Sequence, residues 1–413
     1  MPRYDAVVVG AGPAGSATAA HLARGGARVV LVDRSPFPRD KACGGGLTPR
    51  GVAALARLKV DLAGSEALVV GGLEMFGGGR SLAVRFPSTS RWPAEGLVAR
   101  RSVLDARILE AATEAGASFR VDRVVGPVFS GGVCRGVRTS TEEIGADWTI
   151  AADGATSVVA RAAGLAGAAS SGTGFWYAAM RAYFAPVAPR APEGGPPLLE
   201  FYPLRTPSGR WLPAYGWVFP LPDGSANVGV DLPHAPALAA CPPLRRAFED
   251  FVRGLRRGRE GFADAKMESA PQGALLPESM RGFRPGAPGL LGVGDAAGMI
   301  TPYSGEGIAY ALEGAELVSA AILTGRSPAR VVASYGAELR RAYGFQFESA
   351  FRIMKAMRRP ALAAAAAAIG FRSPRALRAA VRVMAYLIED DATSGSTVSR
   401  GYRWAERAWF GAR

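Results

Sequence analysis

Lysine, histidine and cysteine are scarce in this chain of 413 residues. Only four of its 49 basic residues are lysines, and it has two histidines and three cysteines. Cys43, Cys134 and Cys241 are far apart and odd in number, so the sequence predicts no disulfide framework. A reducing cytoplasm is the expected compartment, and no residue spacing indicates a metal site.

Long hydrophobic segments are also missing. The most apolar late stretch, 361–370, is about half as long as a membrane span. The apolar run at the N-terminus is interrupted by Gly10-Ala-Gly-Pro-Ala-Gly15, and no cleavage signature follows it. We therefore expect a soluble or peripheral protein without a signal peptide.

The net charge of +14 is unevenly distributed. Region 341–413 has thirteen basic residues against five acidic ones. Arginine enrichment with so little lysine indicates codon bias, and no zinc-finger spacing or nucleic-acid module accompanies it, so we expect no nucleic-acid partner. A basic C-terminal region fits an anionic membrane surface or an acidic partner.

The N-terminus has the pattern of a dinucleotide-binding βαβ unit. A hydrophobic strand run, 4–9, leads into Gly10-x-Gly12-x-x-Gly15, a helix pattern covers 16–24, and a second strand run ends at Asp33. Such a turn places a pyrophosphate at the helix N-terminus, and the acid can bind ribose hydroxyl groups.

Segment 293–310 has the features of a flavin site. A short apolar run leads to Asp295, a turn rich in proline and glycine follows, and a helix pattern begins at about Glu306. The acid can bind ribityl hydroxyl groups, and backbone N–H groups at the helix start would stabilise negative charge on a reduced flavin by about 0.3–1 kcal/mol. By itself, the segment could also be an ordinary strand–turn–helix.

The two motifs together favour FAD over NADP. Arg34 follows Asp33 and would suit the 2′-phosphate of NADP, but only a flavin explains the distant Asp295 motif. No second Gly-x-Gly-x-x-Gly unit is present. NAD(P)H would therefore bind transiently as the electron donor, or another reduced carrier, such as an electron-donor protein, would supply the electrons.

The middle of the chain predicts an antiparallel sheet. Short β-like runs over 175–232 are separated by loops rich in proline and glycine, after a helix over 100–116 and strands over 117–128 and 148–153. Period-two alternation places Tyr215, Trp217 and Phe219 on one face, where they either pack a core or line a substrate pocket.

Four sequence features carry a family resemblance. They are the N-terminal Gly-rich unit, Lys41-Ala-Cys43-Gly-Gly-Gly46, Tyr215-Gly-Trp217-Val-Phe219-Pro220, and Gly294-Asp295-Ala-Ala-Gly298 with Gly305-Glu-Gly307-Ile308. Over about residues 1–325 the chain resembles the FAD-dependent geranylgeranyl reductase family. That family includes archaeal digeranylgeranylglycerophospholipid reductases and bacterial menaquinone reductases, and has the p-hydroxybenzoate hydroxylase fold.

The resemblance implies an α/β architecture with interleaved domains. A Rossmann-like FAD-binding domain of the p-hydroxybenzoate hydroxylase type would comprise 1–70, 97–170 and 275–326. An antiparallel-sheet substrate domain would comprise 71–96 and 171–274, and 327–413 would be a helical, basic region.

The resemblance also implies the site residues. The FAD would be bound by Gly10, Gly12, Ala14, Gly15, Asp33, Arg34, Cys43, Gly44, Gly46, Arg101, Val125, Asp295, Gly307 and Ile308. The family's sheet forms the roof of an apolar cavity for an isoprenoid chain, which favours a pocket-lining role for Tyr215, Trp217 and Phe219.

The implied reaction is saturation of isolated C=C bonds in a polyprenyl chain, either geranylgeranyl or the menaquinone side chain. Hydride from flavin N5 would go to one carbon and a proton to the other, while the protein holds the alkene and excludes water. Cys43 and Tyr215 are the candidate proton donors, although Cys43 could be a small packing residue beside the glycines.

Two other functions fit the same scaffold, namely an FAD-dependent monooxygenase or halogenase of a specialised metabolite, and a non-catalytic flavin carrier. Gly298 stands where aromatic hydroxylases carry histidine, and no Trp-x-Trp-x-x-Ile-Pro halogenase element is present. Cys43-Gly-Gly-Gly46 differs from the Cys-Gly-Asp-Gly of menaquinone reductases, so the substrate within the family stays open.

The tail allows two interpretations. Region 381–388 and the arginines before it could dock on the inner face of the cell membrane, or they could form a surface helix pair packed on the FAD domain. The arginines concerned are Arg372, Arg375, Arg378 and Arg382.

Overall fold

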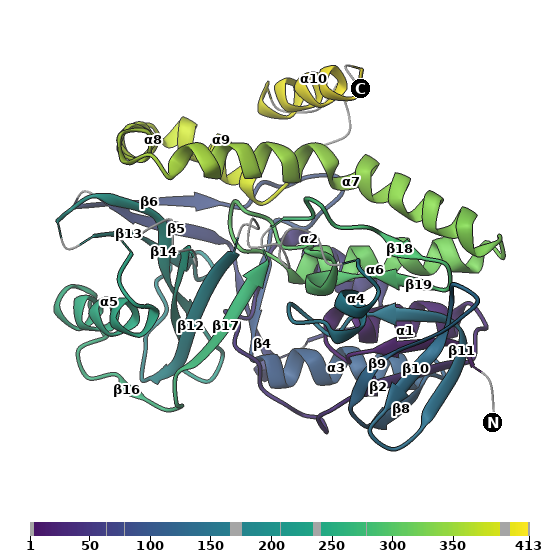
Figure 1. Ribbon diagram of the computed structural model, residues 1–413. Helices are drawn as coiled ribbons and strands as arrows, with labels where there is room; N and C mark the ends of the chain where they lie inside the picture. Colours follow the sequence, from purple (N-terminus) through teal and green to yellow (C-terminus); the bar gives the residue numbers. More distant parts are fainter. Residues whose placement is uncertain are drawn as a thin grey trace.

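The computed structural model describes residues 4–62, 64–77, 79–165, 176–206, 208–233, 241–277, 279–388 and 397–411. The predicted ranges 1–70, 71–96, 97–170, 171–274, 275–326 and 327–413 each include some residues outside these. Two sheets lie side by side, and a long helix runs across both of them (Figure 1). The mixed α/β architecture confirms the expected fold class.

The first sheet is mostly parallel and carries the Gly-rich turn. Its main path is β18 (Gly286–Ala287), β19 (Leu290–Gly292), β11 (Glu143–Ala151), β1 (Tyr4–Val9), β2 (Val29–Asp33) and β8 (Ser118–Val121). An antiparallel extension from β11 contains β10 (Val133–Thr139) and β9 (Val124–Ser130). β1 pairs in parallel with both β2 and β11, and β11 with β19, so segments about 290 residues apart in sequence meet.

Alanine-rich helices cover one face of this sheet. They are α1 (Pro13–Arg24), α3 (Arg101–Glu114) and α6 (Ile308–Leu323), and the opposite face carries the short α4 (Val158–Ala162). Ala17, Ala19 and Ala20 on α1 are fully buried. Because these side chains are small, α3 and α6 can both pack closely on α1, which brings the start of α6 to the turn before α1.

The second sheet is antiparallel apart from one pairing. Its main path is β16 (Lys266–Met267), β12 (Trp176–Ala185), β15 (Ala226–Pro233), β14 (Trp211–Pro220), β13 (Leu199–Arg205), β5 (Gly72–Gly77) and β6 (Arg80–Arg85), and β17 (Gln272–Pro277) pairs with β12. Only β13 and β5 are parallel among these pairs of described strands.

Strict alternation gives the second sheet two different faces. Even-numbered residues such as Val218, Val228 and Val230 pack with α5 (Leu244–Gly258). Odd-numbered residues such as Trp217 and Phe219 point to the other side, toward the first sheet. We call this second side the roof face.

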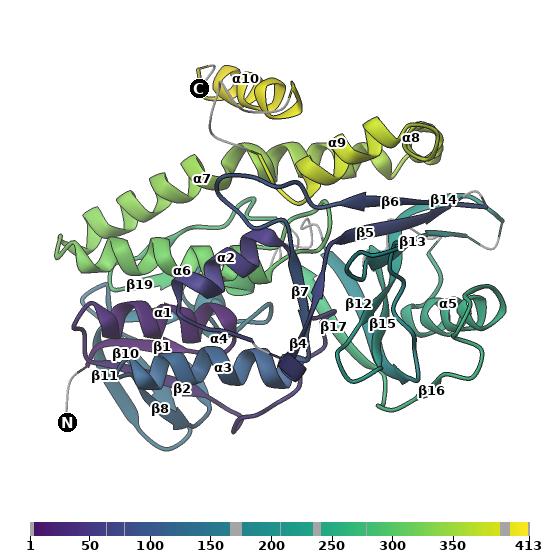
Figure 2. The same ribbon diagram turned by 180° about the vertical axis from the view of Figure 1, so that it is seen from behind.

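A small sheet connects the two halves. It contains β3 (Gly46–Leu47), β7 (Gly96–Ala99) and β4 (Ala67–Val70), with η1 (Gly64–Glu66) before β4 and α2 (Pro49–Arg57) after β3. Figure 2 shows β4 and β7 between the two larger sheets. The chain thus crosses from one half to the other more than once, as the interleaved architecture requires.

The C-terminal helices are α7 (Pro328–Met357), α8 (Pro360–Arg372), α9 (Pro374–Met384) and α10 (Thr397–Gly411). α7 packs on α6 and β18, while α8 and α9 lie against β6 of the second sheet (Figure 1). Leu377 and Val381 are buried against Val84, and Leu387 is buried in the roof-face cluster. The apolar side of the predicted docking segment is therefore internal.

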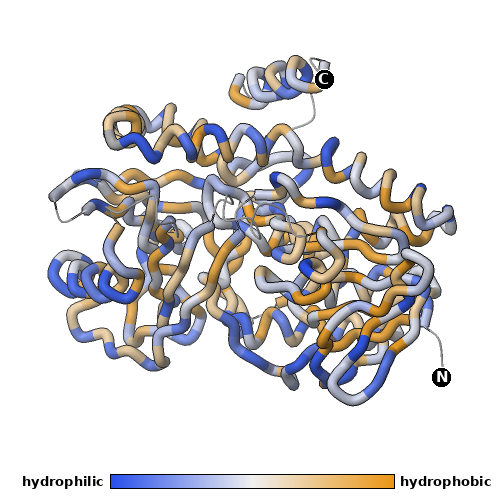
Figure 3. Tube along the Cα trace, viewed as in Figure 1, coloured by the Kyte–Doolittle hydropathy of each residue, from blue (hydrophilic) through white to orange (hydrophobic). Residues whose placement is uncertain are grey.

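Hydropathy along the chain follows this packing. In Figure 3 the strands of the first sheet are largely hydrophobic, whereas α5 is largely hydrophilic where it borders solvent. Within the described part of the chain, no helix has both the length and the apolar character needed to cross a membrane.

Several predicted boundaries differ from the structure. The helix expected over 16–24 begins at Pro13, and the strand expected over 148–153 is part of β11, which ends at Ala151. The single strand expected over 117–128 is divided into β8 and β9, because the Asp122 carboxylate accepts hydrogen bonds from the Ser140 and Thr141 hydroxyls and so fixes a turn there. The helix expected from Glu306 begins at Ile308.

A buried ion pair ties the C-terminal end of α5 to the sheet. The Arg259 guanidinium binds both carboxylate oxygens of Glu200, and both side chains are inaccessible to solvent. Replacing Arg259 with Met should lower the free energy of unfolding by about 3–5 kcal/mol, because a buried carboxylate loses its partner. Urea denaturation measures this loss.

The matched control is Arg245→Met, which breaks the exposed pair Arg245–Glu249 on the same helix. It should change stability by no more than about 0.5 kcal/mol. Equal losses in the two variants would show that burial of the Arg259 pair is not what matters.

Candidate functional site

The Gly-rich turn forms an open cradle at the start of α1. Gly10 has a φ of +95°, in the left-handed region, and a side-chain carbon there would come within 2.5 Å of the Ala152 carbonyl oxygen. A side-chain carbon on Gly15 would overlap the Gly10 carbonyl oxygen. Gly12 is the N-cap of α1 and has no side chain that could bind the first turn of the helix. The backbone N–H groups of that turn can therefore face a phosphate.

Asp33 lies at the end of β2, beside this cradle. Its carboxylate accepts hydrogen bonds from the backbone N–H of Ala11, at 2.8 Å, and of Ser35, at 3.0 Å. The Arg39 guanidinium is 3.7 Å from Asp33 and also binds Asp105 at 3.1 Å. Arg34 is exposed directly after the acid.

The second motif packs directly on the first. Gly294 has a φ of +66°, and a side-chain carbon there would come within 2.7 Å of the Ala14 methyl group. Gly307 caps α6, and a side-chain carbon on it would lie 3.5 Å from Asp295 Oδ1. The pyrophosphate cradle, Asp295 and the start of α6 therefore occupy one region.

The Lys41 segment reaches the same region from another part of the chain. Lys41 Nζ is 3.3 Å from Asp295 Oδ2, and both side chains are partly exposed. No pattern in the sequence predicts this ion pair. An exposed pair of this kind contributes at most about 1 kcal/mol, so a ribityl hydroxyl group can compete for Asp295.

The three glycines after Cys43 lie on the roof face. Side-chain carbons on Gly44 and Gly46 would come within 2.8 Å and 3.1 Å of the Phe219 ring. Asn227 Nδ2 donates to the Cys43 carbonyl oxygen at 2.7 Å, and its Oδ1 accepts from Trp217 Nε1 at 2.9 Å. The aromatic motif thus holds the Cys43 segment through Asn227.

A buried cation lies beside the Cys43 thiol. Arg101 binds both oxygens of Asp105, each at 2.8 Å, and both residues are inaccessible to solvent. Burial alone would lower the pKa of Arg101, but the Asp105 carboxylate and then Cys43 raise it above its ordinary value. Arg101 therefore stays charged and can stabilise negative charge near Cys43.

Tyr215 connects the roof face to the second motif. Its hydroxyl donates to the Ser304 carbonyl oxygen at 2.7 Å. Its ring lies near Trp217 and Phe201, with centroid distances of 6.1 Å and 5.4 Å. Trp217 and Phe219 are buried, and Leu387 from the tail packs in the same cluster. The structure therefore shows these aromatic side chains in a packed cluster, and their pocket-lining role stays a prediction.

Val125 lies on a different strand from the residues described above. It is on β9, which pairs with β10, and its side chain is 53% exposed. The contact of its backbone with the cofactor stays a prediction.

A buried polar cluster supports the start of α6. Arg50 binds the Glu313 carboxylate, Tyr343 donates to the same group at 2.9 Å, and Thr48 donates to Glu306. Burial raises the pKa of Glu306 to about 7, although Arg50 and Thr48 oppose this. The spacing of residues in the sequence could not reveal this cluster, because its members lie in or next to three separate helices, α2, α6 and α7.

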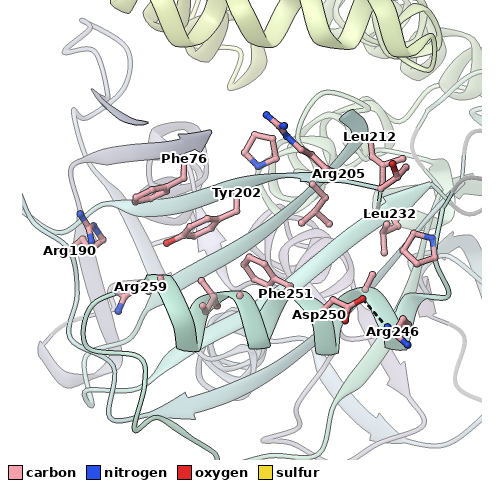
Figure 4. A pocket seen from close by; sticks show the side chains of 18 residues that line it. Phe76, Arg190, Tyr202, Arg205, Leu212, Leu232, Arg246, Asp250, Phe251 and Arg259 are labelled. Carbon is pink, nitrogen blue, oxygen red and sulfur yellow. Dashed lines mark hydrogen bonds and ion pairs between the residues drawn. The ribbon is translucent and has the colours of Figure 1, made fainter. Parts of the chain in front are cut away.

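A cavity of about 650 Å³ opens on the α5 side of the second sheet (Figure 4). Phe76 and Tyr202 are stacked at one end, and Arg246 pairs with Asp250 at the other. Tyr202 pairs with Gly216, which contacts α5, so the cavity lies opposite Tyr215 and Trp217. It is therefore separate from the converging motifs.

In the described ranges, no cluster of three or more His, Cys, Asp or Glu side chains could hold a metal ion. The glycine cradle, the acid at β2 and the open N-termini of α1 and α6 instead fit a dinucleotide and a flavin ring. Backbone donors and two carboxylates form this donor set.

Comparisons with known proteins identify the sequence family. Residues 3–346 match the sequence model of the FAD binding domain. The chain is 36% identical over 413 residues to the menaquinone reductase of Mycolicibacterium smegmatis, covering 98% of this chain and 95% of that protein. It is 30% identical over 373 residues to digeranylgeranylglycerophospholipid reductase 2 of Methanothermobacter thermautotrophicus, covering 86% and 87%.

Solved structures share the fold. A geranylgeranyl bacteriochlorophyll reductase-like protein from Thermoplasma acidophilum superimposes with a TM-score of 0.73 at 21% identity, covering 97% of this chain and 96% of that chain. The flavin-dependent brominase Bmp2 gives 0.72 at 16% identity and covers all of both chains. Such low identities show a common architecture without distinguishing the two chemistries.

The close approach within the Gly-rich turn yields a direct test. Gly15→Ala should weaken FAD binding by more than tenfold, which corresponds to about 1.4 kcal/mol, since the new methyl group displaces the turn at Gly10. Fluorescence titration of the protein with FAD measures the dissociation constant.

The control is Gly126→Ala, because a methyl group there meets open space. Its FAD affinity should equal that of the unaltered protein. Unchanged affinity in Gly15→Ala would show that the turn does not hold the cofactor.

Proposed function

The chain belongs to the FAD-dependent geranylgeranyl reductase family, and from that premise we propose that it saturates isolated C=C bonds in a polyprenyl chain. The substrate would be menaquinone, through its side chain, or a geranylgeranyl lipid. Similarity over nearly the full length to a menaquinone reductase supports this reaction class. When bound, FAD supplies the hydride for each bond.

Most of the residues assigned to FAD lie in the segments that meet at the site, and Val125 is the exception. Gly10, Gly12, Ala14 and Gly15 would hold the pyrophosphate, and Asp33 the adenosine ribose. Asp295 would bind the ribityl chain. The remaining contacts would come from Arg34, Cys43, Gly44, Gly46, Arg101, Val125, Gly307 and Ile308. The convergence of these segments supports the assignment.

The roof face would hold the alkene. An isolated C=C bond offers no strong hydrogen-bond partner, so it must be positioned by shape and apolar contact. Tyr215, Trp217 and Phe219 form such an aromatic wall beside the Cys43 segment, and this is the observation that best supports a prenyl substrate. The wall also excludes water from the reacting carbons.

The electron donor would be NAD(P)H or another reduced carrier that binds transiently. The sequence has one Gly-x-Gly-x-x-Gly unit, and it forms part of the site proposed for FAD. A nicotinamide would therefore approach without a Rossmann domain of its own.

Anaerobic turnover tests the function. The FAD-loaded protein is reduced with dithionite, and menaquinol, whose ring is already reduced, or geranylgeranyl diphosphate is added without oxygen. We expect the oxidised flavin spectrum to return, and the product to gain two mass units per saturated bond. Mass spectrometry of the extracted lipid identifies the product.

The control is saturated phytanyl diphosphate, which should leave the flavin reduced. If the unsaturated compounds also leave it reduced, and only oxygen reoxidises it through a hydroperoxide-like absorbance, then the monooxygenase or halogenase function replaces this one.

A lipid substrate also suggests peripheral contact with the inner face of the cell membrane. Since Val381 and Leu387 are internal, the outward side of α8 is the better candidate. Leu362 and Ile369 there are 43% and 62% exposed, and the exposed Arg359 and Arg372 lie at the two ends of the helix. Each arginine near an anionic surface contributes about 1 kcal/mol.

Co-sedimentation with vesicles tests this contact. The protein should bind phosphatidylglycerol vesicles more strongly than phosphatidylcholine vesicles, and Leu362→Asp with Ile369→Asp should reduce binding about tenfold or more. Phe129→Asp is the control, since Phe129 is 43% exposed on β9, away from the tail. Equal binding by all three proteins would exclude α8 as the membrane surface.

A further inference from the structure

Asp231 is a carboxyl group within the roof face. On β15 it pairs directly with Tyr215 of β14 and with Ala179 of β12. Directly paired residues project from the same side of a sheet. The even-numbered residues Val230 and Leu232 pack with α5, so Asp231 points to the opposite side, where the aromatic wall lies.

This carboxyl group is buried and incompletely bonded. Asp231 is 2% exposed, and its Oδ1 atom has no hydrogen-bond partner. A buried acceptor without a partner costs about 1–3 kcal/mol, so its presence requires an explanation. Burial raises the pKa of Asp231 to about 8, against a small opposing effect of the Leu232 backbone N–H. The group therefore carries a proton at neutral pH.

On this face, the titratable neighbours that the structure describes form no ion pair with Asp231. On this face, Tyr215 lies across from it on β14, while Tyr177 and Arg181 lie two residues either side of Ala179 on β12. The Arg181 guanidinium is directed to Asp40, at 2.6 Å, and to the Lys41 carbonyl oxygen, at 3.0 Å. Its charge thus binds the segment before Cys43 instead of Asp231.

The other candidate proton donors are already engaged. Tyr215 gives its only hydroxyl proton to the Ser304 carbonyl oxygen. The Cys43 sulfur accepts from the Gly45 N–H at 3.5 Å and lies beside the buried Arg101 cation. Among the described residues of the wall, Asp231 is the acid that remains, four residues or about 13 Å along β15 from the Asn227 that holds Cys43. The other buried carboxyl with a raised pKa, Glu306, accepts the Thr48 hydroxyl at the start of α6.

We propose that Asp231 is the general acid that delivers the proton to the alkene. This role rests on the proposed function. With reduced FAD bound, the Asp231 carboxyl would give its proton to one alkene carbon and the other carbon would receive hydride from the flavin, so that the π bond is replaced by two C–H bonds. FAD is left oxidised, Asp231 is left as the carboxylate, and solvent returns its proton.

Asp231→Asn tests the proposal in the anaerobic reoxidation assay. The variant should retain FAD and accept electrons from dithionite, but alkene-driven reoxidation should slow by about 100-fold or more, the usual contribution of a general acid. Asp231→Glu, which keeps the acid, should recover part of the rate. Asp264→Asn, at an exposed loop position, should leave the rate unchanged.

A second readout needs no substrate. Because the folded state holds the Asp231 proton from pH 4 to about pH 8 and the unfolded state does not, stability falls as pH rises through this window. Asp231→Asn should remove that part of the pH dependence and raise Tm at pH 8. The infrared band of protonated carboxyls at pH 6.5 should also weaken in the variant, while the part due to Glu306 remains.

The two assays distinguish failure of the role proposed for Asp231 from failure of the proposed function. Normal reoxidation in Asp231→Asn, or no difference in the pH profile of Tm, would overturn the role of Asp231 while leaving the reductase function intact. If no prenyl compound reoxidises the unaltered protein, the proposed function fails, and the assignment of Asp231 as its acid fails with it.

Discussion

The contact between Gly294 and Ala14 is the constraint on which the rest of the site depends. A side-chain carbon on Gly294 would come within 2.7 Å of the Ala14 methyl group, so only glycine permits this approach. The contact places Asp295 and the start of α6 beside the pyrophosphate cradle of α1. The Ser304 carbonyl, in the loop between Asp295 and α6, accepts the Tyr215 hydroxyl and so links this region to the second sheet.

The register of the second sheet determines what the site can do. Asn227, Gly229 and Asp231 alternate along β15, opposite Phe219, Trp217 and Tyr215. Asn227 holds the Cys43 segment, Gly229 leaves room for the Trp217 ring, and Asp231 keeps a buried acid on an apolar wall. A shift of β15 by one residue would turn Asn227 and Asp231 toward α5, so positioning and acidity depend on a single pairing register.

Sequence alone could predict the parts of this site that are local. A short-range sequence pattern predicts the Gly10–Gly15 turn, Asp33, and the two glycines just before α6, Gly305 and Gly307. The ion pair of Lys41 with Asp295 and the cluster around Arg50 were not predictable, because each joins segments more than 250 residues apart. Burial of Leu387 was also missed, since a basic amphipathic tail fits a bilayer and a protein surface equally well. Asp231 could have been found from the sequence, because period-two alternation places this acid on the same face of the strand as Asn227.

Determining the structure of the FAD-loaded protein with a prenyl substrate analogue would test the central claim most directly. We predict that the isoalloxazine ring lies between the Cys43–Gly46 segment and the start of α6, and that the alkene lies against Tyr215, Trp217 and Asp231. A ring in this position with the prenyl chain in the cavity beside α5 would contradict the account, because hydride and proton could not then reach the same bond.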